Sequence, residues 1–189
     1  MNGLIKPLMK MDEFRIGDLT ARLPIIQGGM GVCVSMSGLA SAVANEGGIG
    51  VISAVGIGMS EPGYRKNFRE SNRIALRKEI RKARLKTEGI IGANIMMAVS
   101  DFDDLLSVAL QEKIDVVFIG AGLPLRIPAF LESINQGDTT TKIVPKVSSA
   151  RAAKLIFRHW LEKYNRIPDA VVVAHRRAGL LDGVEDPLS

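Results

Sequence analysis

The sequence predicts an α/β fold built on a parallel sheet. Six short runs rich in β-branched residues alternate with five longer stretches of helical periodicity, and we find no hairpin signal between consecutive runs. The expected strands are residues 24–27, 49–53, 90–95, 115–120, 142–147 and 169–174. The expected helices are residues 36–47, 61–88, 101–113, 125–135 and 149–164. Alternation of this kind gives parallel strands joined by right-handed crossovers.

Local signals mark the ends of two of these helices. Ser100 precedes the acidic stretch DFDDLL, which predicts a capped helix start, and Ser149 precedes the last helix in the same way. Within that last helix, Ile156 and Trp160 recur at helical spacing and are expected to face the sheet. Asn165 is expected to end it.

The composition predicts one globular domain over residues 1–189. Hydrophobic residues make up 47% of the chain and charged residues 24%, which is ordinary for a globular protein. Cys33 has no second cysteine to pair with, which favours a reducing, cytoplasmic setting and excludes a paired-cysteine metal site. The amino terminus lacks the apolar core of a signal peptide, and no apolar run is long enough for a membrane span. We therefore expect neither a membrane association nor a bound metal.

Positive charge is concentrated in one segment. The chain carries a net charge of +5, yet residues 65–88 alone hold ten basic and three acidic side chains. We interpret this segment as a long surface helix whose cationic side chains lie along its solvated face, rather than as a nucleic-acid site.

Two architectures fit six parallel strands: an open doubly wound sheet, or a TIM-type (β/α) barrel that is incomplete, with about six βα units. In both, ligands bind beyond the carboxyl ends of the strands. Two glycine-rich turns lie there, QGGMG at 27–31 and GAGLP at 120–124, and they favour a flat or phosphorylated ligand.

Two polar residues, Asn94 and Lys146, lie at the carboxyl-end portion of otherwise apolar strands. A buried amide or ammonium needs a partner. A flavin would supply one, because its ring offers acceptors to an amide and gains negative charge on reduction. The alternative is that neighbouring backbone groups satisfy both side chains.

Several motifs occur in a characteristic order. They are PIIQGGMG at 24–31, SGLASAVANEGGIGVIS at 37–53, IGANIM at 91–96, FIGAGLP at 118–124, VSSARAAK at 147–154 and PDAVVV at 168–173. Together they resemble the nitronate monooxygenase family, formerly called 2-nitropropane dioxygenases, over nearly all of residues 14–173.

The resemblance implies a TIM-barrel flavoprotein that binds FMN non-covalently and oxidises alkyl nitronates with oxygen. The positions that it places against FMN are Gly28, Gly29, Met30, Asn94 and Lys146. Gly122 would leave room for the substrate. Flavin-dependent enoyl-acyl-carrier-protein reductases share the opening turns, so this second activity remains an alternative.

The resemblance ends at the sixth strand. The family continues VVVEGPxAGGHxG, whereas this chain reads VVVAHRRAGLLDG, so that Leu181 stands where the catalytic histidine is expected. We therefore describe residues 174–189 as a divergent tail of a partial flavin-binding barrel, truncated relative to the family, and assign no catalytic residue. His175 is a hypothetical substitute. The remaining alternative is a non-catalytic remnant that folds by self-association into a homo-oligomer.

Overall fold

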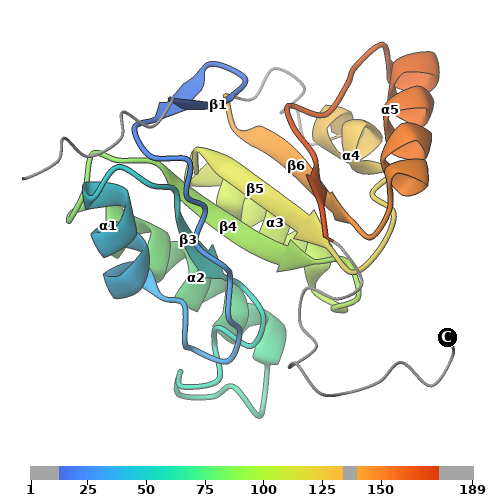
Figure 1. Ribbon diagram of the computed structural model, residues 1–189. Helices are drawn as coiled ribbons and strands as arrows, with labels where there is room; N and C mark the ends of the chain where they lie inside the picture. Colours follow the sequence, from blue (N-terminus) through green and yellow to red (C-terminus); the bar gives the residue numbers. More distant parts are fainter. Residues whose placement is uncertain (1–12, 134–139, 175–189) are drawn as a thin grey trace, which may run out of the picture.

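The computed structural model describes residues 13–133 and 140–174. Its main sheet has five parallel strands in the order β3-β4-β5-β6-β7, which confirms the predicted parallel α/β fold (Figure 1). The strands are β3 (Gly50–Ser53), β4 (Ile91–Met96), β5 (Val116–Gly120), β6 (Lys142–Val147) and β7 (Val172–Val173). The helices are α1 (Ser37–Asn45), α2 (Phe68–Arg84), α3 (Phe102–Gln111), α4 (Ile127–Ser133) and α5 (Ala150–Tyr164).

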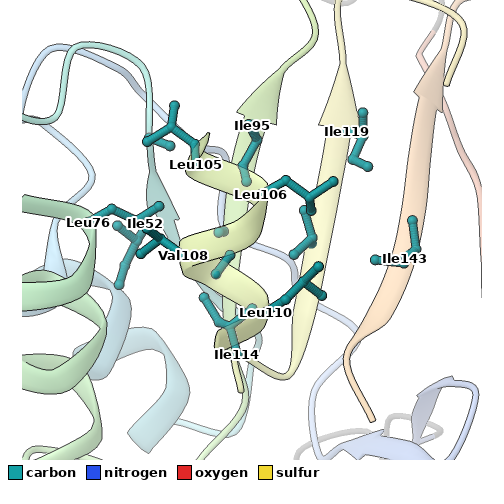
Figure 2. Close-up of a cluster of buried hydrophobic side chains, with 14 of the residues drawn as sticks. Ile52, Leu76, Ile95, Leu105, Leu106, Val108, Leu110, Ile114, Ile119 and Ile143 are labelled. Carbon is teal, nitrogen blue, oxygen red and sulfur yellow. The ribbon is translucent and has the colours of Figure 1, made fainter. Parts of the chain in front are cut away.

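Alternate strand residues face two different apolar clusters. On the helix side, Ile52, Ile95 and Ile119 pack against α3, whose Leu106 and Leu110 point at the strands (Figure 2). The opposite, inner face carries a smaller cluster, which comprises Ile16, Ala21, Ile49, Val51, Val116, Phe118 and Val144. Because both faces of the strands are covered, the strands read as almost continuous apolar runs.

The structure corrects the prediction at the amino end of the chain, where it shows a hairpin. β1 (Phe14–Ile16) and β2 (Leu19–Ala21) pair antiparallel, and their side chains join the inner cluster. Gly17 has a φ of +59° in the two-residue turn, which matches the glycine that such turns require. Asp18 forms an ion pair with Lys142 at 2.7 Å, so the hairpin lies at the amino ends of the sheet strands.

The two outer predicted strands are shorter than expected. Residues 24–27 make only an isolated parallel bridge, Ile26 with Ile49. The bridge does not continue as a strand, because the Gln27 side chain, rather than a backbone group, bonds to the backbone of Val51. Its amide donates to the Val51 carbonyl at 2.9 Å and accepts from the Val51 N–H at 3.2 Å. At the other edge only Val172 and Val173 pair with β6. Within the described residues the sheet is therefore open.

The helix ends agree with the sequence prediction in one helix and not in another. Ser149 caps α5 by accepting from the Ala152 N–H at 3.2 Å, and Asn165 ends it in the left-handed conformation, as predicted. The predicted cap at Ser100 is wrong. Asp101 occupies the capping position of α3, and its carboxylate accepts from the Asn72 amide at 2.7 Å.

Most of the basic segment forms α2 (Phe68–Arg84), whose basic side chains make ion pairs with acidic residues. This helix begins at Phe68, later than predicted, and Asn67 caps it. Its cations face acidic neighbours in the pairs Arg69–Asp104, Arg73–Glu70, Arg77–Glu112, Lys78–Glu61, Arg81–Glu112, Lys82–Glu79 and Arg84–Asp115. This pairing supports its interpretation as a solvated helix face. A bilayer-crossing helix is absent from the described part of the chain.

Candidate functional site

A cavity of about 600 Å³ opens at the carboxyl ends of the strands. It is lined by Gly29, Asn94, Met96, Gly120, Ala121, Gly122, Leu123, Lys146, Val147, Ser148, Ala152 and Ala174. A smaller hollow of about 170 Å³ shares Gly29, Asn94 and Lys146 with it and also reaches Gly28. The fold therefore brings five of the six predicted site residues together. Met30 lines neither hollow, and its side chain is half exposed.

Asn94 and Lys146 lie on the inner face of the sheet, on β4 and β6, with β5 between them. Asn94 is 8% exposed, and Lys146 is partly buried. Neither side chain has a hydrogen bond or ion pair to any residue within 13–133 and 140–174, so neighbouring backbone groups do not satisfy them there. Two polar side chains without partners among the described residues, at one cavity, make this cavity the candidate ligand site.

The glycine turn approaches Asn94 closely. A Cβ atom built on Gly29 would lie 2.6 Å from the Asn94 Cβ, so residue 29 must lack a side chain. The neighbouring Gly28 has nothing within 4 Å of the same position. On the other side of the cavity, a Cβ at Gly122 would lie 3.0 Å from the Met97 Cβ. At Gly29 and Gly122 the cavity is therefore lined by backbone without a side chain.

Ser35 holds the turn in place, a role that the sequence did not reveal. Its hydroxyl donates to the Gly28 carbonyl at 3.2 Å and accepts from the Met30 N–H at 3.0 Å. Its own N–H donates to the Met30 carbonyl at 3.0 Å, and its carbonyl accepts from the Ser53 N–H at 2.9 Å. The fully buried Ser35 thus ties the turn to β3.

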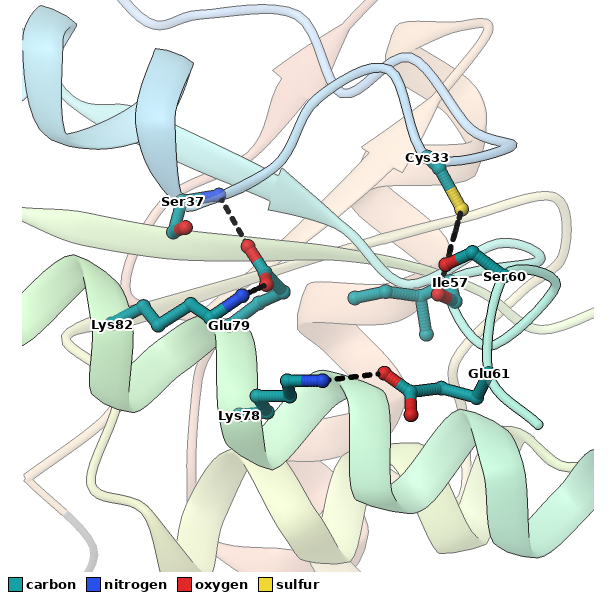
Figure 3. Close-up of polar contacts among 8 residues, drawn as sticks. All are labelled: Cys33, Ser37, Ile57, Ser60, Glu61, Lys78, Glu79 and Lys82. Carbon is teal, nitrogen blue, oxygen red and sulfur yellow. Dashed lines mark hydrogen bonds and ion pairs between the residues drawn. The ribbon is translucent and has the colours of Figure 1, made fainter.

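Strained backbone occurs in both loops at the cavity. Val32, Cys33 and Ala121 adopt positive φ angles of 56°, 61° and 57°. This left-handed conformation is unfavourable for residues with a Cβ, most of all for a β-branched one, and such strain concentrates at functional sites. The Cys33 thiol points at the Ile57 carbonyl at 3.5 Å, on the loop after β3 (Figure 3).

A buried carboxylate fixes the start of α1, the helix that follows the glycine turn. Glu79 accepts from the Ser37 N–H at 3.0 Å and pairs with Lys82 at 2.7 Å (Figure 3). Burial alone would raise the pKa of Glu79, but the hydrogen bonds from Lys82 and Ser37 outweigh it and hold this pKa below its ordinary value. The charged form is therefore the one that anchors the helix.

A hydrogen bond from Trp160 of α5 holds the second glycine-rich turn, residues 120–124. Its indole Nε1 donates to the Pro124 carbonyl at 2.9 Å, and its side chain is fully buried, as its helical spacing predicted. Since Leu123 lines the cavity directly before Pro124, α5 sets the position of this wall. Ala152 in the first turn of α5, together with Ser148 before the helix and Val147 at the end of β6, completes it.

The sixth strand end is described only to Ala174. This residue lines the cavity and donates its N–H to the Val147 carbonyl at 2.8 Å. The predictions for His175, Leu181 and the rest of the tail lie outside the described residues. No group of three or more metal-ligating side chains is found in the described segments.

The family model described as nitronate monooxygenase matches residues 13–105. Residues 13–105 belong to the nitronate monooxygenase family. The match includes the glycine turn and Asn94, whereas Gly122 and Lys146 lie beyond it. The predicted resemblance is thus confirmed, over a shorter range than 14–173.

Solved structures extend the similarity beyond the family match. FabK from Thermotoga maritima is 31% identical with a TM-score of 0.58, and the alignment covers 78% of this chain and 39% of that one. Its M276A mutant gives the same identity and TM-score, with 40% of that chain covered. No curated protein matches the chain. The fold is of the (β/α)-barrel type and is open in the described residues, and the chain spans about two fifths of the length of these FabK structures.

Proposed function

We propose that this chain carries the FMN-binding part of a flavin-dependent oxidoreductase that oxidises alkyl nitronates with oxygen. The observation that carries the proposal is the cavity where Asn94 and Lys146 have no partner among residues 13–133 and 140–174 and Gly29 offers bare backbone. The family match over residues 13–105 supports the reaction class. A cytoplasmic location belongs to the same proposal.

The residues present fit a flavin. The bare backbone at Gly28 and Gly29 would lie along the flat ring, with Met30 continuing the turn, and Asn94 could donate to or accept from its polar edge. Lys146 would hold a positive charge beside that edge. FMN, when bound, supplies a ring that takes up electrons from a substrate and passes them on.

The chain's own groups then have distinct tasks. Lys146 lowers the energy of negative charge near it, because a cation in a partly desolvated cavity attracts an anion more strongly than in water. Asn94 fixes orientation, and the bare backbone of Gly122 leaves space for a substrate. The described lining contains no His, Asp or Glu, so we assign no general base among the described residues.

The test is oxygen consumption by the purified chain with FMN and an alkyl nitronate. The proposal expects turnover that requires added or co-purified FMN. A chain that binds FMN but consumes no oxygen with any alkyl nitronate would restrict the proposal to flavin binding alone.

The similarity to FabK favours a second candidate, a flavin-dependent enoyl-acyl-carrier-protein reductase. The cavity alone does not separate the two, because Gly29, Asn94 and Lys146 would serve either reaction by holding the ring. Oxidation of NADH or NADPH that depends on an enoyl thioester identifies the reductase. Oxygen consumption that depends on a nitronate identifies the monooxygenase.

The open sheet edges favour a third candidate, a non-catalytic chain that self-associates. Ile25 is 49% exposed beside one edge, and Val173 is 51% exposed at the other. Exposed apolar residues at an unpaired parallel edge are suited to contact with a second copy. Size-exclusion mass, measured with the flavin absorbance of the same peak, separates an oligomer without flavin from a flavoprotein.

A further inference from the structure

The Ser53 hydroxyl is anomalous among the described residues. It is the one buried side-chain nitrogen or oxygen atom there without a hydrogen-bond partner. The residue is only 2% exposed, so bulk solvent does not satisfy the hydroxyl. An unsatisfied buried group lowers the stability of the state that contains it, so a state that provides its partner is favoured.

Strand register places Ser53 next to Asn94. The two residues are direct partners in the parallel pairing of β3 with β4. Val51, two residues earlier on β3, belongs to the inner cluster and lines the smaller hollow, whereas Ile52 belongs to the helix-side cluster. Because side chains alternate along a strand, Ser53 faces the same inner side as Asn94.

The two side chains can reach each other. Neighbouring strands lie about 4.8 Å apart, so a serine hydroxyl and an asparagine amide on paired residues come within hydrogen-bond distance by side-chain rotation alone. The Gly29 backbone approaches Asn94 on another side, since a Cβ atom built on Gly29 would lie 3.2 Å from the Asn94 Nδ2.

We propose that Ser53 is a positioning residue for Asn94 in the ligand-bound protein. The Ser53 hydroxyl donates to the Asn94 Oδ1, which directs the Asn94 Nδ2–H toward an acceptor on the flavin ring. The proposal rests on the proposed flavin site and adds to it the group that sets the amide orientation. In this arrangement the side chains of Ser53 and Asn94 both have hydrogen-bond partners.

The experiment is a double-mutant cycle on FMN affinity, measured by quenching of flavin fluorescence. Ser53→Ala is expected to raise the FMN dissociation constant about fivefold to tenfold, the effect of losing one hydrogen bond that orients a binding group. In an Asn94→Ala background the same change is expected to have less than a twofold effect, because the amide to be oriented is gone. Ser53→Thr, which retains the hydroxyl, is expected to restore most of the affinity.

Two controls separate positioning from a general loss of structure. Ser53→Ala is expected to leave the denaturation midpoint of the flavin-free chain unchanged or higher, because it removes an unsatisfied hydroxyl. Ser41→Ala, a change at a comparably buried serine of α1, is expected to leave FMN affinity unchanged.

An unchanged dissociation constant in Ser53→Ala, or an equal effect in the Asn94→Ala background, would overturn the positioning role and leave the proposed function intact. A wild-type chain that binds no FMN would overturn both.

Discussion

Gly29→Ala tests the closest contact of the candidate site. The added Cβ would lie 2.6 Å from the Asn94 Cβ, whereas carbon atoms in contact normally stay about 3.5 to 4.0 Å apart. The turn or Asn94 must therefore move by roughly 1 Å, and overpacking of this kind costs about 1 to 3 kcal/mol. Gly29 does not have a positive φ, so the cost is steric and not conformational.

Gly28→Ala is the matched control. It makes the same chemical change one residue earlier, also without a positive φ, where nothing lies within 4 Å of the new atom. Urea denaturation of the flavin-free chain should show a lower free energy of unfolding for Gly29→Ala by about 1 to 3 kcal/mol, and a change within about 0.5 kcal/mol for Gly28→Ala.

FMN affinity provides the second readout. Because the glycine turn and Asn94 both line the candidate flavin site, displacement of either in Gly29→Ala should also weaken FMN binding by about tenfold. Equal unfolding free energies for the two alanine variants would refute the contact. A destabilised Gly29→Ala variant with unchanged FMN affinity would refute the role of this contact between the turn and Asn94 in binding.

Three further predictions concern named interactions. Glu79→Gln should lower the unfolding free energy at pH 7 by about 1 to 2 kcal/mol. The folded pKa of Glu79 lies below its ordinary value of 4.5, so the difference between the two proteins should shrink as the pH falls below 4.5. A difference that stays constant with pH would contradict this prediction. Trp160→Phe removes the donor to Pro124 and should cost about 1 to 3 kcal/mol in unfolding free energy, with faster amide exchange in the 121–126 turn; unchanged exchange would contradict the anchoring role. Lys146→Gln should make the reduction potential of bound FMN more negative by roughly 30 mV in a spectroscopic titration, and an unchanged potential would place the ammonium away from the ring.

The central strands and the helices could be predicted because their signals are local and repeated. β5 is apolar along its length, and β4 is apolar apart from Asn94, because both faces are buried, and α5 carries its cap and its apolar stripe in its own sequence. The edge strand at 24–27 could not be predicted correctly, since the Gln27 amide replaces a backbone partner of Val51. The hairpin at Gly17 was missed because three-residue strands carry little periodicity.

Some residues of the candidate site could be predicted from the sequence, and others could not. Asn94 and Lys146 were predictable because a polar residue near the carboxyl end of an apolar strand stands out in the sequence. The groups that hold the site in place were not. Ser35 is one serine among many, and Trp160 bonds to a carbonyl 36 residues away, a pairing that only the fold brings about. Ser53 became visible only because the structure shows its hydroxyl without a partner.

The most direct test of the account is titration of the purified chain with FMN, followed by the visible absorbance and fluorescence of the flavin. We expect saturable binding of one FMN per chain, weakened by Lys146→Gln and by Asn94→Ala. A wild-type chain that is folded by circular dichroism, carries no flavin and does not bind added FMN would contradict the assignment of this cavity as a flavin site.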